Sequence, residues 1–146
     1  MSKGDTFEND LLLLVFNNTN AANIGDATGL RGSSTVGSLY VSLHTADPGE
    51  AGNQTTNETA YTGYARVAVA RSAAGFTVTA NSVSLFAATD FGECTASAGA
   101  AITHFAVGTA SSSTGKILYS GTVTPNITMA VGVIPRLKTT GTITED

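Results

Sequence analysis

The chain of 146 residues has little charge, one cysteine and no tryptophan. Asp, Glu, Lys and Arg make up 12% of it, about half the usual ~25% of a globular protein. The hydrophobic fraction of 42% excludes the highly charged, poorly apolar composition of a disordered protein. Cys94 stands alone, so an intrachain disulfide is excluded, and we expect a small buried side chain there. Ala, Gly, Ser and Thr replace the missing charges, and such a neutral surface suits a protein that packs against neighbours.

Basic residues and long apolar runs are also scarce. Seven Lys and Arg are scattered among eleven acidic residues, with a net charge of −4, so we expect no nucleic-acid partner, because phosphate binding needs clustered cations. The apolar run at residues 11–16 is far shorter than the roughly 20 residues that span a membrane. Acidic residues precede it, unlike in a signal peptide. We therefore expect no membrane partner and synthesis in a cytoplasm.

Titratable groups that could carry catalysis are few. His44 and Asp47 could be drawn into a Ser–His–Asp arrangement, but no nucleophile elbow accompanies them. His104 and Cys94 add no zinc-ligand spacing. The acidic residues of the loop after the first strand lack the alternation of a calcium loop and are expected to be solvated: Asp47, Glu50 and Glu58. The expected protein is not an enzyme, and it has no cofactor and no metal.

The N-terminal segment predicts one helix. Asp5 can cap it, with Glu8 three residues later as in a capping box. An apolar stripe at spacings of three and four consists of Phe7, Leu11, Leu14 and Val15, broadened by Leu12, Leu13 and Phe16. A helix of about a dozen residues is marginal in isolation. It must therefore dock, either on its own domain or on a partner subunit.

Residues 17–37 predict a long loop. They are mostly Asn, Thr, Ala and Gly, with Ile24, Leu30 and Val36 as the expected anchors. A loop of about twenty residues is longer than compact domains usually carry. In an assembly protein such a loop often becomes an ordered arm.

After residue 37 the apolar period changes to two. Residues 38–45 predict a half-buried strand, and Asp47-Pro48-Gly49 predicts a turn. Further strands are expected at residues 64–71, 76–80, 83–86, 102–107, 116–123, 127–131, 134–137 and 142–144. This spacing is typical of an antiparallel β-sandwich or jelly-roll-like fold. The expectation is a mainly β single domain over residues 1–146, with helix and extended arm at 1–37 and the sandwich at 38–146.

Two arginines fall within the strand expected at residues 64–71. Arg66 and Arg71 would lie on opposite faces of it. One of them would point outward as an edge charge that discourages wrong strand pairing. Either could instead bind a carboxylate of a neighbouring protein, because Arg is favoured at interfaces.

Several motifs carry a family resemblance. They are LYVSLHTADPGE at residues 39–50, GYAR at 63–66, THFAVG at 103–108 and LYSG at 118–121. With the opening MSKGDTFEND they resemble a family of small structural proteins of tailed bacteriophages, labelled tail fibre or head decoration proteins. The resemblance spans nearly the whole chain, implies a part of the virion and brings no catalytic residues.

Within that resemblance we expect a capsid cement or decoration protein, because the chain is short and lacks the repeats of a fibre. The alternative is a tail fibre, tail or baseplate component. The expected partners are the major capsid protein and copies of the chain itself, as a dimer or trimer. The expected location is the phage head surface. The interface candidates are Phe7, Leu11, Leu14, Arg66 and Arg71.

Overall fold

A computed structural model describes residues 2–145, which fall into two compact units. The first unit consists of Met1–Ser38, Val69–Ala88 and Lys138–Asp146. The second consists of Leu39–Ala68 and Thr89–Leu137. Whether the two units act as the single domain expected from the sequence stays a prediction.

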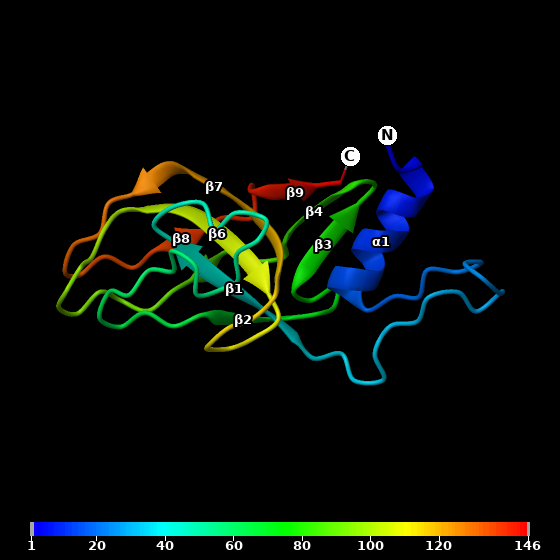
Figure 1. The fold of residues 1–146 in the computed structure, drawn as a ribbon, viewed down its shortest axis with the longest axis horizontal. Coiled ribbons are helices and arrows are strands. Elements are labelled where there is room, and N and C mark those ends of the chain that lie inside the picture. Colours follow the sequence, from blue (N-terminus) through cyan, green and yellow to red (C-terminus); the bar gives the residue numbers. More distant parts are fainter. Residues whose placement is uncertain (1, 146) are drawn as a thin grey trace. The chain divides into compact units, whose positions relative to one another are not determined.

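The described residues form one helix and nine strands (Figure 1). These are α1 (Asp5–Asn17), β1 (Ser38–His44), β2 (Val67–Ala70), β3 (Phe76–Thr79), β4 (Ser82–Leu85), β5 (Thr89–Asp90), β6 (Ile102–Gly108), β7 (Ile117–Ile127), β8 (Arg136–Leu137) and β9 (Thr142–Thr144). The sheets are antiparallel, and none of these strands closes a barrel. The expected fold class is confirmed: the protein is mainly β with one N-terminal helix.

In the first unit, α1 packs against β3 and β4 of a three-stranded sheet in the order β3-β4-β9 (Figure 1). The ring of Phe16 meets that of Phe76 edge-on at 4.9 Å between centroids. Leu12 and Phe16 are fully buried, and burying such a side chain stabilises a fold by about 1.5–3 kcal/mol. The Asn9 side chain donates to the Ala80 carbonyl at the β3–β4 turn. The helix therefore docks on its own unit, which was one of the two alternatives left open by the sequence.

The cap of the helix lies one residue earlier than expected. Gly4 is the N-cap, and its carbonyl accepts the backbone N–H groups of Phe7 and Glu8 at 2.8 and 3.0 Å. The cap residue contributes no side-chain hydrogen bond. The prediction that Asp5 caps the helix is wrong, because Asp5 is already the first helical residue. Its carboxylate still lies at the positive end of the helix dipole.

Strand β1 lies inside a four-stranded sheet of order β2-β1-β6-β7, of which β6, β7 and β1 from Leu39 onward belong to the second unit. Val41 pairs with Val107, and Leu43 pairs with Phe105. The buried apolar residues of β1 and β6 are Leu39, Val41, Leu43, Ile102, Ala106 and Val107. A separate two-stranded sheet joins β5 and β8.

Strand β1 is buried on both faces, which corrects the expectation of a half-buried strand. Ser42 and His44 on its polar face are each 0% exposed. The loop after the strand folds back along it, where the Thr59 backbone N–H donates to the Leu43 carbonyl. On the polar face, the Thr56 carbonyl of the same loop lies 2.9 Å from Nδ1 of His44. The alternation of apolar and polar residues along β1 indicated which side chains share a face. It did not indicate that residues of the following loop bury the polar face.

Several expected strands are shorter or misplaced. Residues 64–71 narrow to β2, so Arg66 and Arg71 flank the strand instead of lying in it. The strands expected at 127–131 and 134–137 reduce to the end of β7 and to β8, and β5 was missed. Residues 142–144 form β9 as predicted.

Candidate partner-binding surfaces

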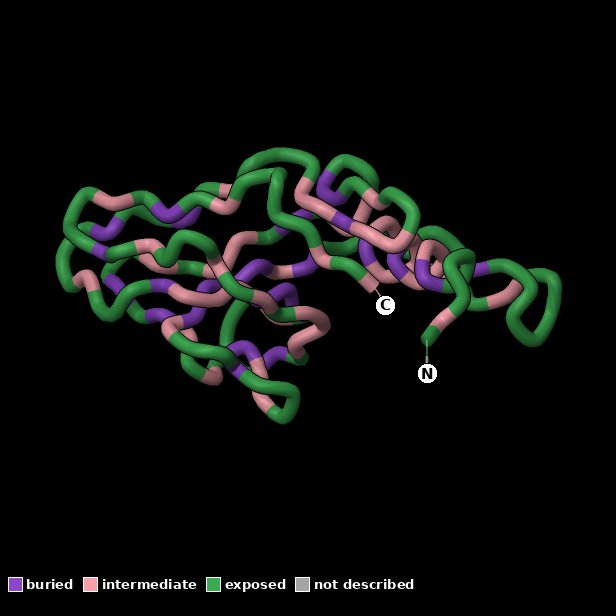
Figure 2. The backbone as a smooth tube through the Cα atoms, turned by 90° about the horizontal axis from the view of Figure 1, so that it is seen from above, coloured by how far each residue is buried: buried purple, intermediate pink, exposed green. Residues whose placement is uncertain are grey.

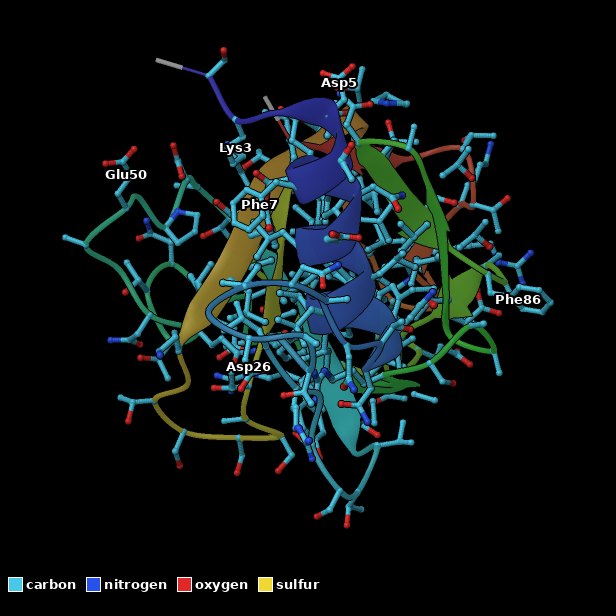
Figure 3. The ribbon with its side chains drawn as sticks, turned by 90° about the vertical axis from the view of Figure 1, so that its right-hand side faces the viewer. Lys3, Asp5, Phe7, Asp26, Glu50 and Phe86 are labelled. Atoms are coloured by element: carbon cyan, nitrogen blue, oxygen red, sulfur yellow. The ribbon has the colours of Figure 1, made fainter. Side chains whose placement is uncertain are left out.

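The helix α1 presents a second apolar face besides the one that packs on the sheet. The buried positions of the helix are Glu8, Leu12 and Phe16. The predicted stripe lies beside them: Phe7 is 41% exposed, and Leu11 and Leu14 are half-buried. Figure 3 shows Phe7 on the flank of the helix. Three of the five interface candidates therefore share one partly uncovered face of the first unit.

Residues 18–37 form an arm that follows the helix (Figure 1). Ala21 and Leu30 exchange two backbone hydrogen bonds of 2.9 Å. Nearer the helix, the Asn18 side chain both accepts from the Ser33 N–H and donates to the Ser33 carbonyl, at 2.6 and 2.8 Å. The side chain of Asn20 accepts from the Gly32 N–H. These bonds hold the two sides of the arm together without a strand ladder.

The tip of the arm is closed by Asp26. Its Oδ1 accepts the backbone N–H groups of Thr28 and Gly29 and the Thr28 hydroxyl. These hydrogen bonds, the Thr28 hydroxyl foremost, lower the pKa of Asp26 below its usual value. The tip is therefore shaped by the chain itself.

The expected anchors of the arm are not buried. Ile24, Leu30 and Val36 are all exposed, and Ala21 is the arm residue that is buried. Figure 2 shows residues of the arm as largely exposed. The expectation was wrong because side-chain amides, not apolar contacts, hold the arm. Its apolar side chains are left on the surface of the first unit, where Phe86 is exposed too (Figure 3).

Arg71 joins the helix to the arm. Its guanidinium donates to the carbonyls of Leu14 and Val15 at 2.6 and 2.7 Å, and to the Ser33 hydroxyl at 2.9 Å. The last carbonyls of a helix have no partner within it and carry its negative dipole end. A cation is therefore well placed there, and Arg71 acts inside the first unit.

Arg66 is also engaged inside its own unit, the second. It forms a two-pronged ion pair with Glu58, with N–O distances of 2.7 and 2.8 Å. The side chains of Arg66 and Glu58 are 3% and 16% exposed. The Tyr64 hydroxyl donates to the same carboxylate at 2.8 Å. Arg66 is therefore not an outward edge charge, the role expected for one of the two arginines, and the prediction of a solvated Glu58 is wrong.

The same arginine fixes the β6–β7 connection. It donates to the carbonyls of Ala110 and Ser113 at 3.0 and 2.8 Å. Its hydrogen bond to Glu58 is the largest cause of the raised pKa of Arg66, which stays charged. Burial is the largest cause of the raised pKa of Tyr64. Little in the sequence indicated this cluster beyond the neighbouring GYAR motif.

His44 belongs to a second buried polar group. Its Nδ1 lies 2.9 Å from the Thr56 carbonyl, which can only accept, so Nδ1 carries the proton. Its Nε2 then accepts from the Ser42 hydroxyl, also at 2.9 Å. Burial lowers the pKa of His44. Asp47, the partner considered in the sequence, is exposed and instead accepts the Gly49 N–H in the predicted turn.

An open hollow of about 340 Å³ lies beside the predicted turn. It is lined by Asp47, Gly49, Glu50 and the first residues of β7, Ile117 to Ser120. Both carboxylates are exposed, as expected for this loop. In the part of the chain that the structure describes, neither forms an ion pair.

Residues 2–145 contain no group of three or more His, Cys, Asp or Glu placed to hold a metal ion. Cys94 is buried with a free thiol, as predicted. Among the same residues no helix is long and apolar enough to cross a bilayer.

The comparison with protein families gives one match. The model of the family described as Podophage GP4 fiber I protein gp80 matches residues 3–144. The match therefore covers parts of both units and every element of the fold. No curated protein matches the chain.

Proposed function

The chain belongs to the podophage GP4 fiber I protein gp80 family and is a structural protein of the phage virion, and we propose that it is a component of a tail fibre. The observation that carries the proposal is the extent of the match, residues 3–144 of 146. The match therefore concerns nearly the whole chain and not one unit. The capsid role favoured from the sequence becomes the second candidate.

Within a fibre this chain would act as a small module and not as the shaft. The described element with the most residues is the 13-residue helix α1, and the strands have 2 to 11 residues each. Long fibrous shafts are built from sequence repeats, and this sequence has none. We propose that it forms a base, joint or tip, where short contacts to several chains are needed.

The proposed contacts to other virion proteins lie on the first unit. They are the helix face of Phe7, Leu11 and Leu14, with the exposed arm beside it. Arg66 and Arg71 are not among these proposed contacts, because the side chain of each is hydrogen-bonded within its own unit. We propose no catalytic role, since the Ser42–His44 pair is fully buried and its hydrogen bonds fix a loop.

The second candidate is a capsid cement protein that binds the major capsid protein. The arm of the first unit favours it, since an arm can bridge neighbouring capsid subunits. Copies would then sit at symmetric positions on the shell.

Labelling intact virions separates the two candidates. Antibodies against the purified chain, coupled to gold, are applied to phage particles and seen by electron microscopy. The proposal expects label on the tail and none on the head. Label spread over the head contradicts it and supports the capsid candidate.

A further inference from the structure

Strand β7 is an unusually uncovered edge strand. In the order β2-β1-β6-β7 it has a strand neighbour on one side only, among the strands that the structure describes. None of its 11 residues is buried, although five of them are Ile117, Leu118, Tyr119, Val123 and Ile127. Edge strands of this kind are templates for pairing with another chain.

The middle of the strand has little of the usual protection of an edge. No residue of β7 is charged; the nearest charge is the exposed Lys116 just before it. Natural edges are often blunted by Lys, Pro or a bulge. Here Pro125 stands in a bulge, where four residues of β7 (123–126) face the single residue Thr103 of β6. The pairing shifts register again between Val107 and Gly108, so Leu118 is an extra residue of β7. The regular part is therefore Tyr119 to Thr122, and it has no such device.

The hollow beside this edge supplies a charge preference. Asp47 and Glu50 line it together with residues 117–120 of β7. Figure 3 shows Glu50 pointing away from the loop that carries it. A strand added along β7 would lie against this acidic hollow, so a basic residue on that strand is favoured.

We propose that β7 pairs with β7 of a second copy of this chain, as an antiparallel two-fold contact. An antiparallel pair over residues 117–120 of both copies brings Lys116 of each copy close to Ser120 of the other. Ser120 lines the hollow, so the long side chain of Lys116 reaches the carboxylates of Asp47 and Glu50 in the other copy. The contact is self-complementary, as a two-fold interface requires, and it forms two equal sets of ion pairs.

This inference deepens the proposed function, since it names the surface through which copies of a fibre module join. It fails separately from that function. Virion labelling tests the location, whereas the β7 contact is tested on the purified full chain.

The test is a charge exchange measured by sedimentation equilibrium. Wild type is expected to dimerise, and Lys116→Glu and Glu50→Lys are each expected to weaken the dimer roughly tenfold or more, because each places like charges together. A mixture of the two variants is expected to dimerise again, because each contact between position 116 of one variant and position 50 of the other then joins an acidic and a basic side chain. Glu93→Lys and Lys138→Glu are matched controls, because both residues are exposed and outside the hollow, and they should leave the dimer unchanged.

Hydrogen exchange adds a readout of strand pairing. Amides in residues 117–122 are expected to gain protection as the protein concentration rises, and less so in Lys116→Glu. A chain that stays monomeric at all concentrations overturns the proposal. A dimer that ignores both charge reversals overturns it as well, because its interface then lies elsewhere.

Discussion

At the scale of single residues, the two Arg–carboxylate pairs of the second unit differ in their surroundings. Arg66 and Glu58 are 3% and 16% exposed in their side chains, whereas Arg136 and Asp90 are 58% and 45% exposed. An ion pair in water gains little, while removal of one partner from a buried pair leaves an uncompensated charge. The stability of the second unit should therefore depend on one pair and not on the other.

Replacement of Arg66 by Met tests this dependence. Breaking a buried ion pair costs about 3–5 kcal/mol, and here the change also releases the carbonyls of Ala110 and Ser113. We expect a loss of roughly 3 kcal/mol in the free energy of unfolding, measured by urea denaturation. Arg136→Met is the matched control and should not move the urea midpoint. Equal effects of the two changes would contradict a structural role of the buried pair.

His44 predicts a pH dependence of stability. Its pKa in the folded chain is lowered from the ordinary value of 6.5, chiefly by burial. As the pH falls through 6.5, the unfolded chain takes up this proton and the folded chain resists it, so the folded state loses stability. The loss grows until the pH reaches the lowered pKa of the folded state.

The variant His44→Gln removes this contribution. We expect the melting temperature of the wild type to fall more steeply between about pH 7 and about pH 5 than that of the variant. The measurement is the melting temperature by circular dichroism at several pH values. Identical slopes for the two proteins would show that His44 does not resist protonation in the fold.

At the scale of elements, the sequence predicted the helices, turns and strands whose pattern lies within the element itself. The helix was predicted because apolar residues recur every three and four positions, and α1 confirms it. The turn at Asp47 and the strand β9 were found for the same reason, since turn chemistry and short β-branched runs are read from neighbours.

Features that depend on distant residues were missed. Arg71 donates to the carbonyl of Leu14, 57 residues away in the sequence. The Asn18 side chain accepts from the N–H of Ser33, 15 residues away. The cover over His44 likewise comes from a loop and not from the strand itself. Polar side chains at such separations have no period, so composition marked residues 17–37 as a loop but did not indicate its hydrogen bonds.

The hydrogen bonds of Arg71 to the helix and to Ser33 predict how the arm responds to mutation. Arg71→Ala should free the helix carbonyls and the base of the arm, so the amides of Ala21 and Leu30 should exchange faster with solvent, by roughly tenfold. Hydrogen exchange with mass spectrometry measures this. Arg31→Ala is the control, since Arg31 is exposed within the arm itself. If the arm keeps its protection from exchange in Arg71→Ala, the hydrogen bonds of Asn18 and Asn20 are sufficient to hold it.

The partly uncovered helix face predicts a loss of assembly without a loss of fold. Leu11→Asp with Leu14→Asp places charge on this face, while Leu12 and Phe16 keep α1 on its sheet. We expect the double variant to retain its circular dichroism spectrum but to be absent from purified virions. Phe86→Asp, at another exposed apolar site of the same unit, is the comparison. Full incorporation of the double variant would remove this face from the proposed contacts.

At the scale of the whole molecule, the chain combines two compact units with few charges and several uncovered apolar side chains. The family match establishes a virion structural protein, and the structure adds which surfaces remain open to partners. The resemblance noted from the sequence motifs led to the same class of protein. The preference for the head over the tail rested on the short chain without repeats, on the helix and arm beside a β-sandwich, and on the low charge. A small fibre module can share these features with a cement protein.

The most direct test of the proposed place in a tail fibre is the number of copies in one virion. Quantitative mass spectrometry of purified particles gives this number relative to the major capsid protein. A fibre component should be present in at most a few dozen copies, because a tail carries few fibres of low-order symmetry. Hundreds of copies, in a fixed ratio to the capsid subunits, would contradict the fibre assignment and make the chain a capsid protein.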